Sequence, residues 1–135
     1  MSIDYMVVRF QQGEGAELDQ SVFDDIFGAY LVEEEDDFAR ADFPDGSAAD
    51  IYHDDDSVMF NHCGGEAFRE AVYQLIARTQ GYIYWGSGDG AVADAATLAE
   101  LPELPGRIGV VRSGQELLDW IDRSQRDSSC PPPGR

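Results

Sequence analysis

The sequence predicts an α+β fold: a four- to five-stranded, mostly antiparallel sheet built in the order β-α-β-β-α-β, with an added C-terminal helix. Two observations predict it. Residues 57–85 read as strand, glycine turn, amphipathic helix, glycine stop and strand, and residues 3–30 read as strand, polar turn and helix. This succession matches the split βαβ, or ferredoxin-like, pattern, in which two helices cover one face of a four-stranded sheet. A sheet with the same elements in a different strand order is the main alternative.

The strand–helix–strand stretch is the best-formed unit. An apolar run at 58–60 is stopped by the Gly-Gly pair at 64–65, and apolar residues then recur at helical spacing over 68–76. Gly81 follows the last periodic residue, where a left-handed conformation closes a helix. Tyr82–Trp85 has the aromatic and β-branched content of a strand.

The N-terminal part supplies the first strand and the first helix. Ile3–Phe10 is apolar on both of its faces, which predicts a central strand that is covered, at least in part, on both sides. After a polar turn, an apolar stripe at helical spacing runs from Val22 to Tyr30, with Asp19 or Ser21 as its cap.

Acidic residues dominate the next segment. We predict a long acidic loop over Glu33–Ser47, then a hairpin of two strands, Ala49–His53 and Ser57–Asn61. Asp54-Asp55-Asp56 forms the turn of that hairpin, and such a charged turn is tolerable only where water surrounds it.

The C-terminal third is less regular. We expect a flexible glycine turn at 86–90, a short helix within 91–101, an extended proline connector and a short edge strand at Ile108–Val111. A capping box begins a helix over Ser113–Ser124, which we expect to cover the other face of the sheet. Residues 1–125 then form a single domain, and the proline-rich residues 126–135 form a disordered tail.

The net charge of −18 is the strongest compositional signal, with 27 acidic against 9 basic residues. Such a surface repels phosphate and anionic lipid, which argues against nucleic-acid and membrane partners. It favours a basic protein partner, although genome composition or salt adaptation would give a similar charge. We find no signal peptide and no apolar run that spans a bilayer, so we expect a cytoplasmic protein.

The acidic stretches are the predicted partner-binding residues. Their functional interpretation is a surface that docks a basic protein, and the alternative is a merely solvated face. The predicted residues are Glu33, Glu34, Glu35, Asp36, Asp37, Asp54, Asp55 and Asp56.

Other candidate sites have weaker support, and we assign no catalytic residue, no metal and no cofactor. Cys63 beside His62 near a helix start suits a nucleophilic thiolate, but a half-buried structural cysteine is the favoured interpretation. The histidines, Cys63 and the Asp54–Asp56 run lack the spacing of zinc or calcium sites. The glycine turn at 86–90 has no Lys, unlike a phosphate-binding loop. The aromatic strand Tyr82–Trp85 suits either a ligand platform or the core, and the core is favoured.

Three stretches carry a family resemblance. Phe68–Gly81, Tyr82–Trp85 and 93–98 resemble the helix, Thr-x-Gly stop, strand and acidic turn of small α+β immunity proteins from bacterial polymorphic-toxin systems. The resemblance covers about the middle third of the chain. It implies an acidic, single-domain, cytoplasmic protein that neutralises a toxin by covering its active site, with an acidic stripe against a basic cleft.

The sequence therefore predicts a non-catalytic acidic binding protein that inhibits or sequesters a basic partner. The alternative is a small ligand-binding or cysteine-dependent enzyme domain centred on His62-Cys63 and the Tyr82–Trp85 strand.

Overall fold

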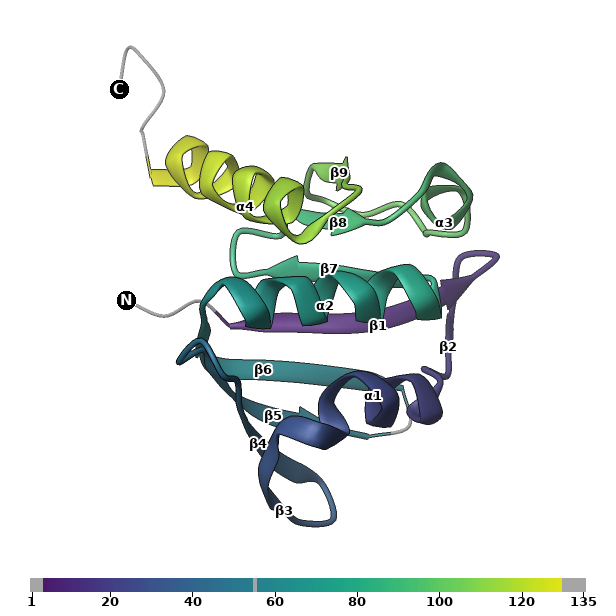
Figure 1. Ribbon diagram of the computed structural model, residues 1–135. Coiled ribbons are helices and arrows are strands. Elements are labelled where there is room, and N and C mark those ends of the chain that lie inside the picture. The colour runs from purple at the N-terminus through teal and green to yellow at the C-terminus, as the bar shows by residue number, and fades with distance from the viewer. Residues whose placement is uncertain (1–3, 55, 130–135) are drawn as a thin grey trace.

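Strand β1 (Tyr5–Gln11) lies inside a long sheet in the computed structural model, which describes residues 4–54 and 56–129 (Figure 1). Its two neighbours, β6 (Ser57–Gly64) and β7 (Gly81–Trp85), are both antiparallel to it. Helix α2 (Glu66–Thr79) connects these neighbours, so β1 lies between two strands that a helix joins. The strand–helix–strand unit predicted over residues 57–85 is confirmed.

The sheet is longer than predicted. Within the described residues it has nine strands, in the order β3-β4-β5-β6-β1-β7-β8-β9, with β2 paired to β1. All the pairs are antiparallel except β8 with β9, which confirms the α+β, mostly antiparallel class. The predicted four to five strands and the simple β-α-β-β-α-β order are wrong in detail, because short strands were missed. The remaining strands are β2 (Glu14–Ala16), β3 (Leu31–Glu34), β4 (Phe38–Asp42), β5 (Ala48–His53), β8 (Gly90–Val92) and β9 (Ile108–Val110).

The predicted acidic loop over Glu33–Ser47 is the main local error. β3 and β4 form a hairpin, and β4 pairs with β5, with Phe38 opposite Tyr52. On β4, the fully buried Ala39 and Ala41 alternate with more exposed neighbours. This is the period of a half-buried strand, and the surrounding charges obscured it.

All the longer helices lie on one face of the sheet (Figure 1). These helices are α1 (Gln20–Phe27), α2 and α4 (Gly114–Ser129), and a 3-10 turn at Gly28–Tyr30 extends α1. The short helix α3 (Ala95–Ala99) lies beside β8. Helix α4 packs against α2, so the prediction that it covers the other face is wrong. Its buried Leu117 and Ile121 join the same core as α2. It also extends through the expected start of the tail to Ser129; residues 130–135 lie outside the described part.

Burial along β1 separates the two faces of the sheet. Val7 is fully buried against the helices, together with Ile83 and Phe60 of the neighbouring strands. Val8 and Phe10 point the other way and are only partly buried. We call this second side the open face, because the longer helices all lie on the opposite side (Figure 1).

In the described part of the chain, no helix is both long enough and apolar enough to cross a membrane.

Candidate partner-binding surface and adjoining groove

The fold brings the two predicted acidic stretches together. Strands β3 to β6 run antiparallel to one another in chain order, so the β3–β4 and β5–β6 turns meet at the same end of the sheet. The backbone N–H of His53 donates to the carbonyl of Asp37 at 3.1 Å, which joins the two turns directly. Asp37 and Asp54 also line one shallow hollow of about 230 Å³.

We call this end of the sheet the acidic surface. All of its members are exposed, and Asp55, the remaining predicted residue, lies outside the described part of the chain. Its members are Glu33, Glu34, Glu35, Asp36, Asp37, Asp54 and Asp56.

One member of the acidic surface has a structural role of its own. A carboxylate oxygen of Asp54 accepts hydrogen bonds from the backbone N–H groups of Asp56 at 2.9 Å and Ser57 at 2.8 Å. These bonds lower the pKa of Asp54 and fix the turn. Asp54 therefore organises the turn, and the side chains at 33–37 are better placed to meet a partner.

Apolar side chains adjoin the acidic surface. The rings of Phe38 and Tyr52 pack at 5.1 Å between centroids, and Tyr52 is 42% exposed. Val32 of the edge strand β3 is 61% exposed. Aromatic anchors surrounded by polar groups are typical of protein–protein contacts. The charges of Glu33 and Glu34 also discourage pairing of this edge strand with other chains, which is the structural explanation for them.

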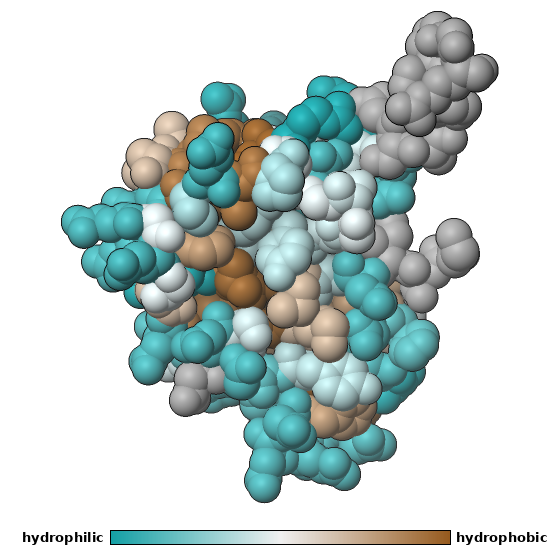
Figure 2. Space-filling model, turned by 180° about the vertical axis from the view of Figure 1, so that it is seen from behind, coloured by the Kyte–Doolittle hydropathy of each residue, from teal (hydrophilic) through white to brown (hydrophobic). Residues whose placement is uncertain are grey.

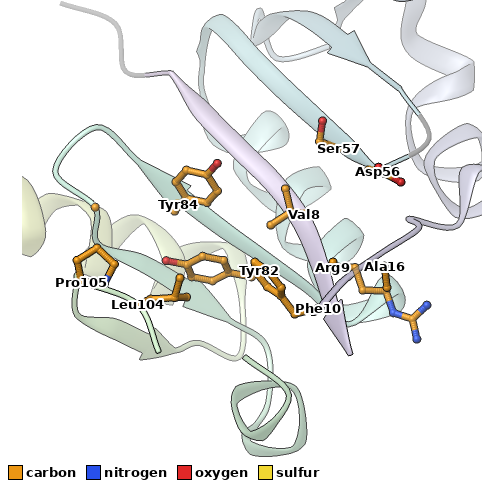
Figure 3. A pocket seen from close by; sticks show the side chains of 12 residues that line it. Val8, Arg9, Phe10, Ala16, Asp56, Ser57, Tyr82, Tyr84, Leu104 and Pro105 are labelled. Carbon is orange, nitrogen blue, oxygen red and sulfur yellow. The ribbon is translucent and has the colours of Figure 1, made fainter. Parts of the chain in front are cut away.

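A groove of about 510 Å³ crosses the open face (Figure 3). Phe10, Tyr82 and Tyr84 form a row of rings along it, with centroids 6.3 Å and 5.4 Å apart. Leu104 and Pro105 of the proline connector form one wall. Seen from behind, the molecule shows apolar side chains gathered between hydrophilic margins (Figure 2). We call the three rings the aromatic row.

The polar groups of the groove are few. Asp56 and Ser57 lie at its margin, across strand β1 from the aromatic row (Figure 3). Arg9 also borders it, but its guanidinium points away from the rings and donates to the carbonyl of Glu17 at 3.5 Å. Burial, with Tyr84 and Asp89 nearby, raises the pKa of Tyr82 to about 12, so its hydroxyl stays protonated at neutral pH.

The cysteine candidate is poorly placed for catalysis. His62 is exposed, and its Nδ1 lies 2.9 Å from a carboxylate oxygen of Asp50. Burial, aided by the charge of Asp4, raises the pKa of the Cys63 thiol to about 12. A nucleophilic cysteine needs a lowered pKa. Across residues 4–54 and 56–129, His, Cys, Asp and Glu side chains form no group of three or more that could hold a metal ion.

Sequence reasoning missed a buried polar network in the predicted flexible turn. Asp89 is buried, and its carboxylate accepts three hydrogen bonds. Two come from Arg107, from its backbone N–H at 2.9 Å and its guanidinium Nη2 at 2.8 Å, and the third comes from the Ser124 hydroxyl at 2.7 Å. The indole N–H of Trp85 donates to Ser124 at 3.0 Å. Asp89 lies 18 and 35 positions from its partners, so no local pattern indicates these contacts. The network fixes the connector that forms the groove wall.

No protein-family model, curated protein or solved structure matches this chain. The resemblance to immunity proteins therefore stays a prediction.

Proposed function

We propose that this protein is a non-catalytic acidic binding protein that inhibits or sequesters a basic protein partner in the cytoplasm. One observation carries the proposal: two acidic turns, at 33–37 and 54–56, meet at one end of the sheet beside the exposed ring of Tyr52. Immunity against a toxin is the setting that the sequence resemblance implies.

Charge and apolar contact have separate roles in this proposal. A net charge of −18 attracts a basic protein over a long range, and a local group of carboxylates orients it. Such charges raise the association rate more than the affinity. Phe38 and Tyr52 supply apolar area that desolvates on contact, which is where affinity arises.

The acidic surface has little internal compensation. Arg40, on the neighbouring strand, lies 2.8 Å from Asp50 and 3.6 Å from Asp42, so its charge is already shared between two carboxylates. A cationic partner therefore meets carboxylates whose charge is not balanced by this arginine. The same charges repel phosphate, which supports excluding nucleic acid and anionic membranes as partners.

The enzyme alternative loses its main support from Cys63, whose raised pKa disfavours the thiolate. Cys63 also lies apart from the groove, which is lined by Tyr82 and Tyr84. The ligand-binding part of that alternative keeps the groove as its support.

The test compares capture of proteins from the source organism's lysate by three immobilised forms, at low and high salt. The neutralised variant carries E33Q, E34Q, E35Q, D36N and D37N. The matched control carries E14Q, E17Q, D24N, E103Q and D122N, which removes the same charge from exposed positions elsewhere.

We expect one basic protein to be retained at low salt by the wild type and the control. The neutralised variant should release it, and high salt should weaken its retention, because the Debye length shortens. Equal retention by the neutralised variant contradicts the proposal, as does the lack of any retained basic protein at low salt.

A further inference from the structure

The groove on the open face has the form of a binding site for an extended chain. The aromatic row forms its floor, and Leu104 and Pro105 rise along one side (Figure 3). Tyr84 is partly exposed and turns its ring toward the groove. Tyr82 is 3% exposed, so the rings that a ligand can contact are those of Phe10 and Tyr84, and an elongated ligand can span both.

The backbone of the floor restricts what can bind. The groove lies over β1 and β7, whose backbones are already paired with each other and with further strands on both sides. An added β-strand would find no free ladder partner there. A polyproline II segment has no internal hydrogen bonds and keeps its carbonyls solvated, so it loses nothing by lying on a sheet face.

The spacing of the rings suits such a segment. The centroids of Phe10 and Tyr82 are 6.3 Å apart, and those of Tyr82 and Tyr84 are 5.4 Å apart. A polyproline II helix has three residues per turn, so side chains three positions apart share a face and lie about 9.3 Å apart. Two side chains on one face of such a helix therefore reach the two partly exposed rings, Phe10 and Tyr84, which lie on either side of the buried Tyr82. Aromatic grooves bind proline-rich chains in a similar way.

Charge decides which segment is favoured. Asp56 is an exposed carboxylate at the groove margin and also belongs to the acidic surface, so the two surfaces are continuous. The guanidinium of Arg9 is turned away. A second copy of this chain is disfavoured, because each copy carries a net charge of −18. A segment with a cationic side chain near Asp56 is complementary.

We propose that the open-face groove binds an extended, proline-containing segment of the basic partner, with an arginine or lysine of that segment at Asp56. This inference rests on the proposed function for the existence of a basic partner. It adds the chemistry of the segment that the partner inserts.

Synthetic peptides test the inference without knowledge of the partner. The full-length protein, labelled with ¹⁵N, is titrated with a proline-rich peptide of about ten residues, long enough to pass the aromatic row. The peptide is made in two versions with a single arginine each, at the N-terminal end in one and at the C-terminal end in the other. The matched controls replace that arginine by glutamate, or replace the prolines by glycine and serine while keeping the arginine.

We expect the proline–arginine peptide to shift the amide signals of Phe10, Tyr82, Tyr84 and Leu104. Its affinity should fall about tenfold in Y84A, since aromatic anchors dominate such contacts, and about threefold in D56N, as for an exposed ion pair. The glycine–serine peptide should leave these four signals unchanged. Y30A, a half-buried tyrosine away from the groove, is the control for loss of an aromatic side chain.

Three results would overturn the inference. The first is no shift at the groove with any peptide. The second is that only the amide signals of residues 33–37 shift, and that they do so equally with the proline peptide and the glycine–serine peptide. That result would leave the proposed function intact and contradict only binding in the groove. The third concerns residues 131–135, Pro-Pro-Pro-Gly-Arg, which have the same chemistry. If replacing Pro131, Pro132 and Pro133 by serine moves the groove signals without any peptide, the occupant belongs to this chain and not to a partner. Failure of the lysate capture alone, with peptide binding intact, would overturn the proposed function instead.

Discussion

The buried hydroxyl of Ser124 on helix α4 donates a 2.7 Å hydrogen bond to the carboxylate of Asp89, in the turn between β7 and β8. Ser124 also accepts from the indole N–H of Trp85, and Asp89 is held by Arg107. Three distant parts of the chain therefore meet at one polar centre: the sheet, the C-terminal helix and the connector. Because the connector forms one wall of the groove, this centre positions the candidate site although it lies outside it.

Replacing Ser124 by alanine should destabilise the protein strongly. The S124A variant leaves the buried indole N–H without its acceptor and removes one donor from Asp89. Leaving buried polar groups unpaired costs about 1–3 kcal/mol, which urea unfolding would measure. S87A is the comparison: the exposed Ser87 hydroxyl accepts only a long hydrogen bond, at 3.4 Å, from the backbone N–H of Asp89, so its loss should change the free energy of unfolding by less than about 0.5 kcal/mol. Equal effects of the two changes would contradict the role given to the network.

The same network makes part of the stability depend on pH. Burial acts to raise the pKa of Asp89, but hydrogen bonds from Arg107 and Ser124 outweigh it, so the pKa in the folded state lies below its ordinary value. The folded state then binds fewer protons than the unfolded state. The contribution of Asp89 is fully present above the unfolded pKa and is lost as the pH falls through the folded pKa.

The D89N variant isolates this contribution from those of the other carboxylates. The difference in unfolding free energy between wild type and D89N should narrow as the pH falls from about 4, the ordinary pKa of aspartate, toward about 2. Urea unfolding at several pH values would measure it. A difference that stays constant over this range would show that the charge of Asp89 contributes nothing.

The two neighbouring glycines before helix α2 should respond differently to alanine. Gly65 has φ of +105°, and a Cβ there would lie 1.9 Å from the Ser47 hydroxyl. G65A should therefore cost at least about 2 kcal/mol. At Gly64 a Cβ meets nothing within 4 Å, so G64A should change stability by no more than about 0.5 kcal/mol. Thermal unfolding of both variants checks this, and similar losses would contradict the packing described at Gly65.

The Cys63 thiol should react slowly in the folded protein. With a pKa of about 12 it is almost entirely protonated at neutral pH. In a C130S variant, which leaves Cys63 as the one thiol, alkylation should be at least about a hundredfold slower than that of free cysteine, because the thiolate is the nucleophile. Unfolding in urea should restore the fast rate. Fast alkylation of the folded protein would reopen the cysteine-dependent alternative.

The helices and strands that were predicted correctly are those marked by short-range patterns in the sequence. The helical period defines α2, and the capping box places the start of α4. The prediction that Gly81 takes the left-handed conformation is wrong: Gln80 takes it, with φ of +55°, and Gly81 already begins β7. Strand β4 was missed because acidic residues suggested a loop, although alternation at Ala39 and Ala41 signals a strand. Nothing local indicates on which face of the sheet a helix will pack, so α4 was placed wrongly.

The candidate site could be predicted only in part. Both acidic stretches were identified, but their meeting depends on the missed β3–β4 hairpin. Tyr82 and Tyr84 were recognised as a candidate platform and assigned to the core, because large aromatic side chains dominate the core of small domains. Tyr82 is indeed buried, whereas Tyr84 is partly exposed. The groove wall at Leu104 and Pro105 depends on Asp89 and its long-range partners, which no motif reveals.

The most direct test of the central claim measures the association rate between this protein and the captured basic partner as a function of ionic strength. The wild type should associate fastest at low salt, and its rate should fall steeply as salt is added. Neutralising residues 33–37 should lower the low-salt rate about tenfold and flatten the slope, since electrostatic steering is lost. The charge-matched control should keep most of the wild-type slope. Parallel slopes for the wild type and the neutralised variant would contradict docking through the acidic surface.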